Sequence, residues 1–253
     1  MKQDNHPVSE STMNLALNAP RLASPIVELR QYTLKPDQRE TLISLFDREF
    51  VETQEATGMT VIGQFRDLDR PDMFVWLRGF ADMEARKQAL TAFYGGPVWA
   101  AHKDAANATM IDSDDVLLLK PAWRGAEFDL SGLRRPAMVE AKSMSDDRCL
   151  PGFVEISIHH LQPGTEAGFA ERFRTETLPR MTADGAQVLA AFISERAENT
   201  FPRLPVRAGE TVFVAATAAA DAAASRGPSE HVAPEVTRTQ TLRLAPTRRS
   251  LLG

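Results

Sequence analysis

The chain has 253 residues, 43% of them hydrophobic and 25% charged, which is enough apolar material for one large or two small globular domains. Its net charge of −5 comes without a basic block, which argues against nucleic acid as a partner. No apolar run approaches the length of a membrane span, and the first residues lack the pattern of a secretory leader, so we expect a cytoplasmic protein with no membrane span. Cys149 is the only cysteine, so neither an internal disulfide nor a thiolate metal cluster can form.

Residues 1–24 show little periodicity and read as an extended segment ahead of the first regular element. From Ile26 onward apolar and polar side chains alternate, which predicts a strand. A helix is predicted after Pro36, because an apolar stripe follows at helical spacing, and it should end at Gly58, a residue type that readily adopts the left-handed conformation of a helix stop. The stripe consists of Leu42, Leu45, Phe46 and Phe50.

Two further strands are predicted at 59–66 and 73–80, on either side of the turn DLDRPD. Asp82 can cap a helix that runs to Gly95, and Pro97 suits the first turn of another helix that ends near Met110. The acidic run IDSDD lacks the glycine and the distal glutamate of a calcium loop, so we interpret its carboxylates as turn and cap residues. A strand at 116–120 completes this half of the chain.

The second half of the chain repeats this order. Shifting the sequence by 127 residues aligns 26–65 with 153–192 without a gap and gives 10 identities in 40 positions, where roughly two or three would arise by chance. FVWLRGFAD at 74–82 then matches FVAATAAAD at 213–221, an offset of 139, because the second copy carries twelve additional residues around NTFPRLPVRAGE. The Ala-rich segment 221–236 is interrupted by glycine and proline, which predicts a short or broken helix.

Each copy has the βαββαβ order of a ferredoxin-like unit, in which two helices pack on one face of a four-stranded antiparallel sheet. We therefore expect an α+β protein built from tandem ferredoxin-like repeats. The first unit would occupy 25–122, followed by a linker at 123–151 and a second unit at 152–253. The bare faces of the two sheets could then cover each other.

Strand alternation sorts the side chains of each unit into two faces. We assign the apolar set, such as Val27, Leu29 and Ile156, to the helix-covered face, which leaves the polar set for the space between the sheets. Strand 73–80 places large aromatics on that same polar face, and a water-facing sheet seldom exposes them, so a covered chamber is favoured over a solvated surface. The expected lining consists of Glu28, Arg30, Tyr32, Trp76, Arg78, Ser157 and His159.

Three stretches carry a family resemblance: VELRQYTLKP, FYGGPVWAAHKDAANATMIDSDDVLLLKPA and NTFPRLPVR. They resemble the bacterial NIPSNAP family, closely over 25–122 and more loosely over 152–252. The resemblance implies the dimeric α+β barrel, or ferredoxin-like, superfamily, which includes cofactor-free monooxygenases, haem enzymes and lactone isomerases. NIPSNAP proteins have no settled reaction, so the resemblance implies a fold rather than a chemistry. Strand 213–219 departs from the family pattern because it lacks the expected aromatics.

Acid and base candidates in the first half are Glu28 and His102. Glu28 could move a proton while a neighbouring arginine stabilises an enolate or carboxylate. His102 shares a helix stripe with Trp99, near Asn107, and could act as an acid or base near pH 7, although a hydrogen-bonded packing role is the commoner one. Tyr94 could reach the mouth of a cavity or simply pack on its neighbours.

In the second half, His159 is the third candidate for proton transfer. His159 and His160 point to opposite faces of a strand and cannot chelate one ion together, so we predict no metal site and no cofactor, with haem on His159 as the alternative. The insertion 199–207 carries Arg203 and Arg207, which could clamp a carboxylate at the barrel rim. A solvated surface loop is the alternative interpretation.

These features predict a protein that binds a small organic molecule between two sheets. A cofactor-free oxygenase or isomerase is the enzymatic form of this hypothesis. The alternative is a non-catalytic binding or scaffold protein whose barrel interior is packed. Ionisable groups around an open volume would favour ligand binding, whereas apolar packing would favour the scaffold. The sequence leaves the oligomeric state open and is compatible with a homo-oligomer.

Overall fold

The computed structural model describes residues 21–143, 152–219 and 233–252. Cys149, residues 1–20 of the expected N-terminal extension and residues 221–232 of the expected broken helix lie outside the described residues. Within the described part of the chain, no helix is long and apolar enough to cross a membrane.

The first half of the chain follows the predicted order of elements. It contains β1 (Ile26–Leu34), α2 (Arg39–Leu45), the π-helical turn η1 (Phe46–Phe50), α3 (Val51–Glu55), β2 (Thr60–Asp67), β3 (Met73–Phe80), α4 (Met83–Tyr94), α5 (Pro97–Thr109) and β4 (Met110–Pro121). As expected, the Asp82 side chain caps α4 by accepting a hydrogen bond from the backbone N–H of Ala85, at 2.7 Å. The acidic run at 111–115 belongs to β4 rather than to a turn, because β4 pairs with β1 as far as Met110 through two register shifts.

The second half repeats these elements at the spacing found in the sequence. After α6 (Met138–Ser143) come β5 (Phe153–Leu161), α7 (Glu166–Arg172), η3 (Phe173–Thr177), α8 (Leu178–Ala183), β6 (Gln187–Ser194), β7 (Val212–Ala219) and β8 (Val236–Pro246). The bounds of β1, α2, η1 and β2 recur in β5, α7, η3 and β6 with a shift of 127 residues, and those of β3 recur in β7 with a shift of 139. Even the bulge between Val61 and Gly63 recurs between Val188 and Ala190.

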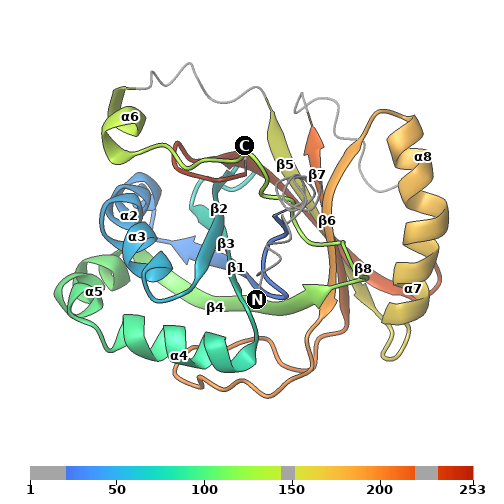
Figure 1. Cartoon of the computed structure of the whole chain (residues 1–253), viewed down its shortest axis with the longest axis horizontal. Coiled ribbons are helices and arrows are strands. Elements are labelled where there is room, and N and C mark those ends of the chain that lie inside the picture. Colours follow the sequence, from blue (N-terminus) through green and yellow to red (C-terminus); the bar gives the residue numbers. More distant parts are fainter. Residues whose placement is uncertain (1–20, 144–151, 220–232, 253) are drawn as a thin grey trace, which may run out of the picture.

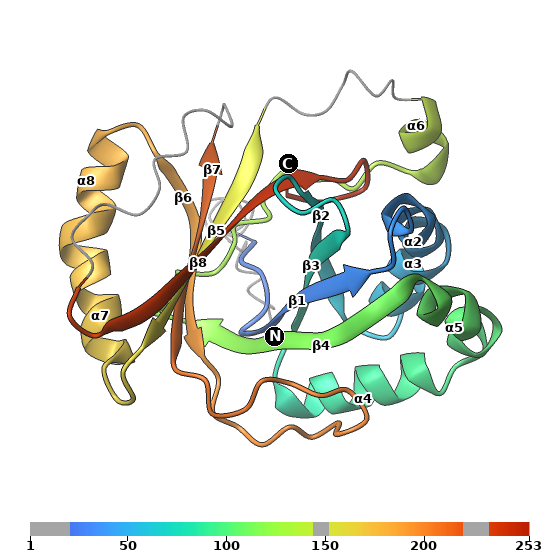
Figure 2. The same cartoon turned by 180° about the vertical axis from the view of Figure 1, so that it is seen from behind.

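The strands form one closed barrel in the order β1-β3-β2-β8-β5-β7-β6-β4, and every neighbouring pair is antiparallel. Each half supplies four adjacent strands, and the halves are joined by β2 with β8 and by β4 with β6. Figures 1 and 2 show the helices of the first half on one side of the barrel and α7 and α8 on the other. The helices therefore lie outside, and the two sheets face each other inside.

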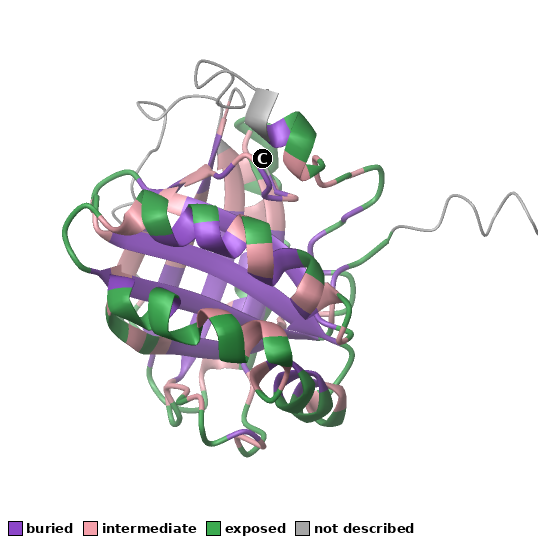
Figure 3. Cartoon of the chain, turned by 90° about the vertical axis from the view of Figure 1, so that its left-hand side faces the viewer, coloured by how far each residue is buried: buried purple, intermediate pink, exposed green. Residues whose placement is uncertain are grey.

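The barrel interior is filled by apolar side chains from both sheets, all of them buried. The first half contributes Val27, Leu29, Val75, Leu77, Leu117 and Leu119, and the second half contributes Val154, Ile156, Ile158, Val214, Leu242 and Leu244. The assignment of faces from the sequence is therefore wrong. The apolar set faces the opposite sheet, and the polar set of the first half lies under the helices. Figure 3 shows these helices crossing over buried strands.

One end of the barrel is closed by the segment that the sequence suggested was a linker. Phe128 and Leu130 are buried in the barrel core, and residues 21–23 pair with this segment ahead of β1. Because the segment follows the end of β4 and pairs with residues just before β1, it covers the end of the barrel at which β1 begins. We call the opposite end, where β4 and β8 begin, the mouth.

We expect Phe128→Ala to destabilise the protein by about 3 to 5 kcal/mol, because it removes a ring that is 1% exposed and leaves a cavity in the barrel core. Val139→Ala, at a residue that is 80% exposed on α6, should change stability by less than about 0.5 kcal/mol. Urea unfolding followed by circular dichroism measures both. Equal effects would show that the segment does not close the core.

Candidate functional site

The register of β1 against β3 brings the polar residues of the first half together. Glu28 lies opposite Arg78, and Arg30 lies opposite Trp76. Residues on one face of neighbouring strands are close enough for their side chains to touch. This face is covered by α2, η1, α4 and α5, whose apolar residues pack against Trp76 and its neighbours (Figure 3).

Glu28 is the centre of a cluster of charges. One carboxylate oxygen, Oε2, accepts hydrogen bonds from Arg30 Nη1 at 2.7 Å and from Arg78 Nε at 2.8 Å. The other, Oε1, accepts one from Arg86 Nε at 2.7 Å. Arg86 comes from α4, so the helix closes the cluster from above the sheet. All four side chains are at most 1% exposed. We call these four residues the arginine cluster.

The arginine cluster holds more positive than negative charge. Three guanidinium groups surround one carboxylate, and guanidinium groups stay protonated in proteins. Burial by itself would raise the pKa of Glu28, but the charges of Arg78, Arg30 and Arg86 outweigh it and hold the pKa well below its usual range. Glu28 is therefore ionised at neutral pH, and two positive charges in the cluster remain without a carboxylate.

The surroundings of the cluster are aromatic and contain unused donors. The Arg30 and Arg78 guanidinium groups lie 5.6 and 5.0 Å from the Trp76 ring centre, in the range of cation–π contacts. The Trp76 indole N–H is buried and has no hydrogen-bond partner. The Nη2 groups of Arg78 and Arg86 lie 2.8 and 2.6 Å from Glu28 oxygens, but not at hydrogen-bonding angles, so their N–H bonds also point elsewhere.

The insertion of the second half packs on the arginine cluster of the first half. Asn199 Oδ1 accepts a hydrogen bond from Arg86 Nη1 at 3.0 Å, and the Thr200 hydroxyl donates to the backbone oxygen of Met83 at 3.3 Å. The Phe201 ring stacks on Tyr94, with ring centres 5.9 Å apart. Figures 1 and 2 both show this loop running alongside α4. The cover of the cluster thus comes from both halves of the chain.

The second half provides an internal comparison, because it has the same strands without the cluster. At the positions equivalent to Arg30 and Arg78 it has Ser157 and Thr217, and the glutamate, Glu155, is kept. These strands pair in the same register, with Glu155 opposite Thr217 as Glu28 is opposite Arg78. The barrel therefore forms on the second side without buried arginines at these positions. The arginine cluster is therefore a feature of the first half and not a general requirement of this strand arrangement.

The structure brings together some of the residues predicted from the sequence and separates others. Glu28, Arg30, Tyr32, Trp76, Arg78 and Tyr94 gather at the cluster, with Arg30 Nε donating to the Tyr32 hydroxyl at 3.0 Å. Trp99 reaches only its edge, where the ring packs on Tyr94 with centres 4.9 Å apart. All of these residues belong to the first half of the chain.

The remaining predicted residues lie away from the cluster. His102 pairs with Glu49, with Nε2 and Oε2 3.4 Å apart, and Asn107 is exposed on the same helix. Ser157 and His159 are on β5 in the second half, and Arg203 is exposed above the Phe201 ring.

His159 lies under α7 rather than in a chamber between the sheets. Its Nδ1 is 3.0 Å from the Thr239 hydroxyl, and its ring packs on Phe169 and Phe213. Burial, together with the neighbouring His160, lowers the pKa of His159, so it is neutral at pH 7. Its environment is that of a packed histidine. Among the described residues, no group of histidines, cysteines and carboxylates could hold a metal ion.

Sequence reasoning missed Arg86 of the arginine cluster and two residues that contact the cluster, Gln54 and Asn199. Gln54 Oε1 accepts a hydrogen bond from Arg78 at 3.1 Å. Arg86 could have been found, because it lies on the buried stripe of α4 with Ala89, Leu90 and Phe93, and an arginine on an apolar stripe requires a buried partner. No local pattern indicates Asn199, whose position depends on how the two halves pack.

A closed antiparallel barrel covered outside by helices defines an α+β barrel protein. Residues 27–123 match the NIPSNAP family model, so the first half of this chain is similar to a NIPSNAP domain. The expected family resemblance over 25–122 is confirmed by this match.

Two known structures are similar to this chain over most of its length, and a third is similar to a shorter part. A candidate monooxygenase from Lactobacillus acidophilus is 12% identical, with a TM-score of 0.54, over 88% of this chain and 94% of its own. A second candidate monooxygenase, from Fusobacterium nucleatum, is 10% identical, with a TM-score of 0.54, over 89% and 93%. A NIPSNAP family protein from Agrobacterium tumefaciens is 21% identical over 38% of this chain and 91% of its own, with a TM-score of 0.36. No curated protein matches the chain.

Glu28→Gln should destabilise the protein by about 3 to 5 kcal/mol, because it leaves three buried guanidinium groups without their carboxylate. Glu155→Gln is the matched control at the equivalent, partly exposed position and should change stability by less than about 1 kcal/mol. Chemical denaturation of the two variants measures the difference. If the two substitutions cost the same, the charge on Glu28 does not hold the cluster together.

Proposed function

We propose that the NIPSNAP half of the chain binds a small organic anion at the arginine cluster, between its sheet and its helices. The observation that supports this is the excess of buried positive charge: three guanidinium groups, each at most 1% exposed, share one carboxylate. Burying an uncompensated charge is expensive, and proteins usually pair such a group or use it to bind a ligand. A bound monoanion would reduce that excess from two positive charges to one.

The chemistry of the cluster favours a carboxylate on a flat, unsaturated group. Guanidinium groups bind carboxylates through two parallel hydrogen bonds, and the unsatisfied N–H groups of Arg78, Arg86 and Trp76 are donors without acceptors. Trp76, Tyr32 and Tyr94 surround these donors with aromatic rings, which stack well on planar ligands. This site lies under the helices, so it replaces the chamber between two sheets that the sequence suggested.

As an enzyme, the protein would be an oxygenase or isomerase that works without a cofactor. The guanidinium groups would stabilise the negative oxygen of an enolate formed from the bound anion. Glu28 would act by positioning them, because its lowered pKa makes it a poor proton acceptor at neutral pH. Two structures that are similar over most of the chain are candidate monooxygenases, and they support this only by analogy.

The alternative is a non-catalytic scaffold, and one observation favours it: the space between the sheets is filled by apolar side chains. In either case we propose that the chain consists of two tandem ferredoxin-like units, at 25–122 and 152–253. The repeated strand order, in which the first strand of each half lies between its third and fourth, supports this arrangement. The scaffold would keep the first-half cluster only as a structural ion-pair network.

Fluorescence of Trp76 can test anion binding. In a Trp99→Phe/Trp123→Phe background Trp76 is the only tryptophan left, and it touches the cluster. Benzoate should change its emission in a saturable way. The neutral isostere benzamide should bind at least about 10-fold more weakly, because it lacks the charge that makes hydrogen bonds to guanidinium strong.

The control variants separate binding from folding. Arg30→Gln should weaken benzoate binding by about 10- to 100-fold, whereas Arg124→Gln, at an exposed arginine of the segment after β4, should leave it unchanged. Thermal melts show whether each variant folds. Equal binding of benzoate and benzamide, or saturation by neither, would contradict the proposal and favour the scaffold.

A further inference from the structure

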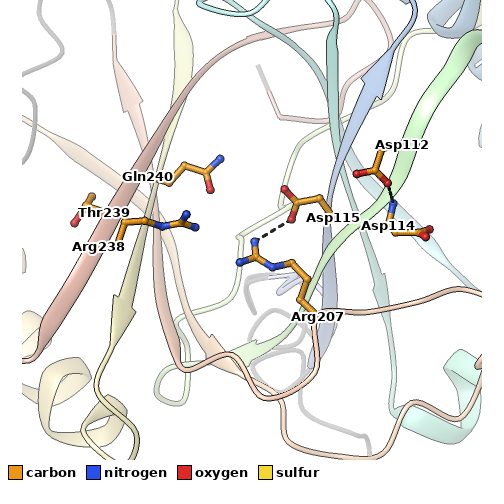
Figure 4. Close-up of a pocket in the computed structure, with 7 residues that line it drawn as sticks. All are labelled: Asp112, Asp114, Asp115, Arg207, Arg238, Thr239 and Gln240. Atoms are coloured by element: carbon orange, nitrogen blue, oxygen red, sulfur yellow. Dashed lines mark hydrogen bonds and ion pairs between the residues drawn. The ribbon is translucent and has the colours of Figure 1, made fainter.

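The mouth of the barrel contains a second polar site that is separate from the arginine cluster. A cavity of about 710 Å³ opens there, which is within the size range of small-molecule sites. Its lining consists of Asp112, Asp114, Asp115, Arg207, Arg238, Thr239 and Gln240 (Figure 4). Asp115 alternates along β4 with the core residues Leu117 and Leu119, and Gln240 alternates along β8 with Leu242, so these side chains face the inside of the ring of strands.

A continuous chain of charged and polar contacts runs along this mouth. Arg207 donates to Asp115 Oδ1 at 3.0 Å and to Glu210 Oε1 at 2.6 Å. Glu210 Oε2 lies 3.0 Å from His160 Nδ1, and His160 Nε2 lies 2.8 Å from Arg238 Nη2. The contacts thus link Asp115 of the first half to Arg238 of the second half through Arg207, Glu210 and His160.

The contacts of His160 define its protonation. Arg238 can only donate, so His160 Nε2 must accept its hydrogen bond, and the ring proton must lie on Nδ1, where it is donated to Glu210. Burial and the charge of Arg238 lower the pKa of His160, against the opposing effect of Glu210. The neutral imidazole therefore holds Arg238 in place without neutralising its charge.

Charges of opposite sign remain unmatched across the cavity. Among the described residues no carboxylate lies within ion-pair distance of Arg238, while Asp115 and Glu210 are already paired with Arg207. Asp112 and Asp114 likewise have no basic partner in the described part of the chain. Figure 4 shows Arg238 on β8 and these two aspartates on β4, on opposite sides of the opening.

A buried donor below the cavity also lacks a partner. Gln31 is 1% exposed, and its Oε1 accepts a hydrogen bond at 2.8 Å from Gln240, a lining residue. The Nε2 of that same amide has no partner. An unsatisfied buried amide next to an open polar cavity is the arrangement expected where a ligand or its water supplies the missing acceptor.

We propose that the mouth binds a small zwitterion, an organic molecule with a carboxylate at one end and an ammonium group at the other. Arg238 binds the carboxylate, and Asp112 and Asp114 bind the ammonium group. His160 is a positioning residue that orients Arg238. The other charged groups facing His160, which are Glu210 and Arg207, belong to the internal network and are not free for the ligand.

Three probes with the same carbon chain test this assignment: 4-aminobutyrate, butyrate and butylammonium. Imidazole ¹⁵N signals of His160, identified by their loss in His160→Gln, report on ligand binding next to Arg238. 4-Aminobutyrate should shift them in a saturable way, and butyrate and butylammonium should bind at least about 10-fold more weakly, because each satisfies only one side of the cavity.

Variants show which residues account for that preference. Arg238→Gln should weaken 4-aminobutyrate binding at least about 10-fold. In Asp112→Asn/Asp114→Asn, 4-aminobutyrate should bind no more tightly than butyrate. Arg124→Gln is the exposed control and should behave like the unmodified protein. Equal binding of 4-aminobutyrate and butyrate by the unmodified protein, an unchanged affinity in Arg238→Gln, or no saturable shift with any probe would overturn the proposal.

Discussion

The buried contact between Glu28 and three arginines is the interaction on which the arrangement of this protein depends. A sheet with charged side chains on one face must either expose that face or satisfy its charges internally. Here the first half satisfies them largely through Glu28, so helices can cover the polar face. The apolar face is then free to meet the second sheet and fill the barrel. The incomplete balance of charge that remains supports the proposal that the cluster binds an anion.

The two halves show how one architecture can support different chemistry. Their strands, π-helical turns and bulges recur at the same positions, so the two halves share a backbone arrangement and differ in their side chains. The second half has Ser157 and Thr217 in place of two buried arginines, and its insertion supplies Asn199 to the cluster of the first half. One half therefore carries the cluster and the other contributes to its cover and to the mouth. Neither feature follows from the barrel itself.

Much of the local structure could be predicted. The turn at Gly58, the cap at Asp82 and the 127-residue repeat depend on short-range chemistry, and the structure has each of them at the expected place. Alternation shows which side chains share a face of a strand, but it does not show what covers that face. The sequence therefore could not show which face points into the barrel and which lies under the helices. An apolar face suits a helix layer and a second sheet equally well. Arg86 reaches Glu28, and Glu210 reaches His160, only through tertiary packing, so nothing near them in the sequence identifies those two partners.

The sequence by itself determined the order of elements, the duplication and the grouping of Glu28, Arg30 and Trp76 on one face, because these depend on backbone periodicity and on residues close along the chain. Tertiary structure alone decided that this face lies under helices, that Asn199 contacts Arg86 across the two halves and that the mouth stays polar. The physical reason is that the strands close into a barrel. Once eight strands form a ring, only one face of each can point inward, and the side chains that fill that confined space best are the apolar ones.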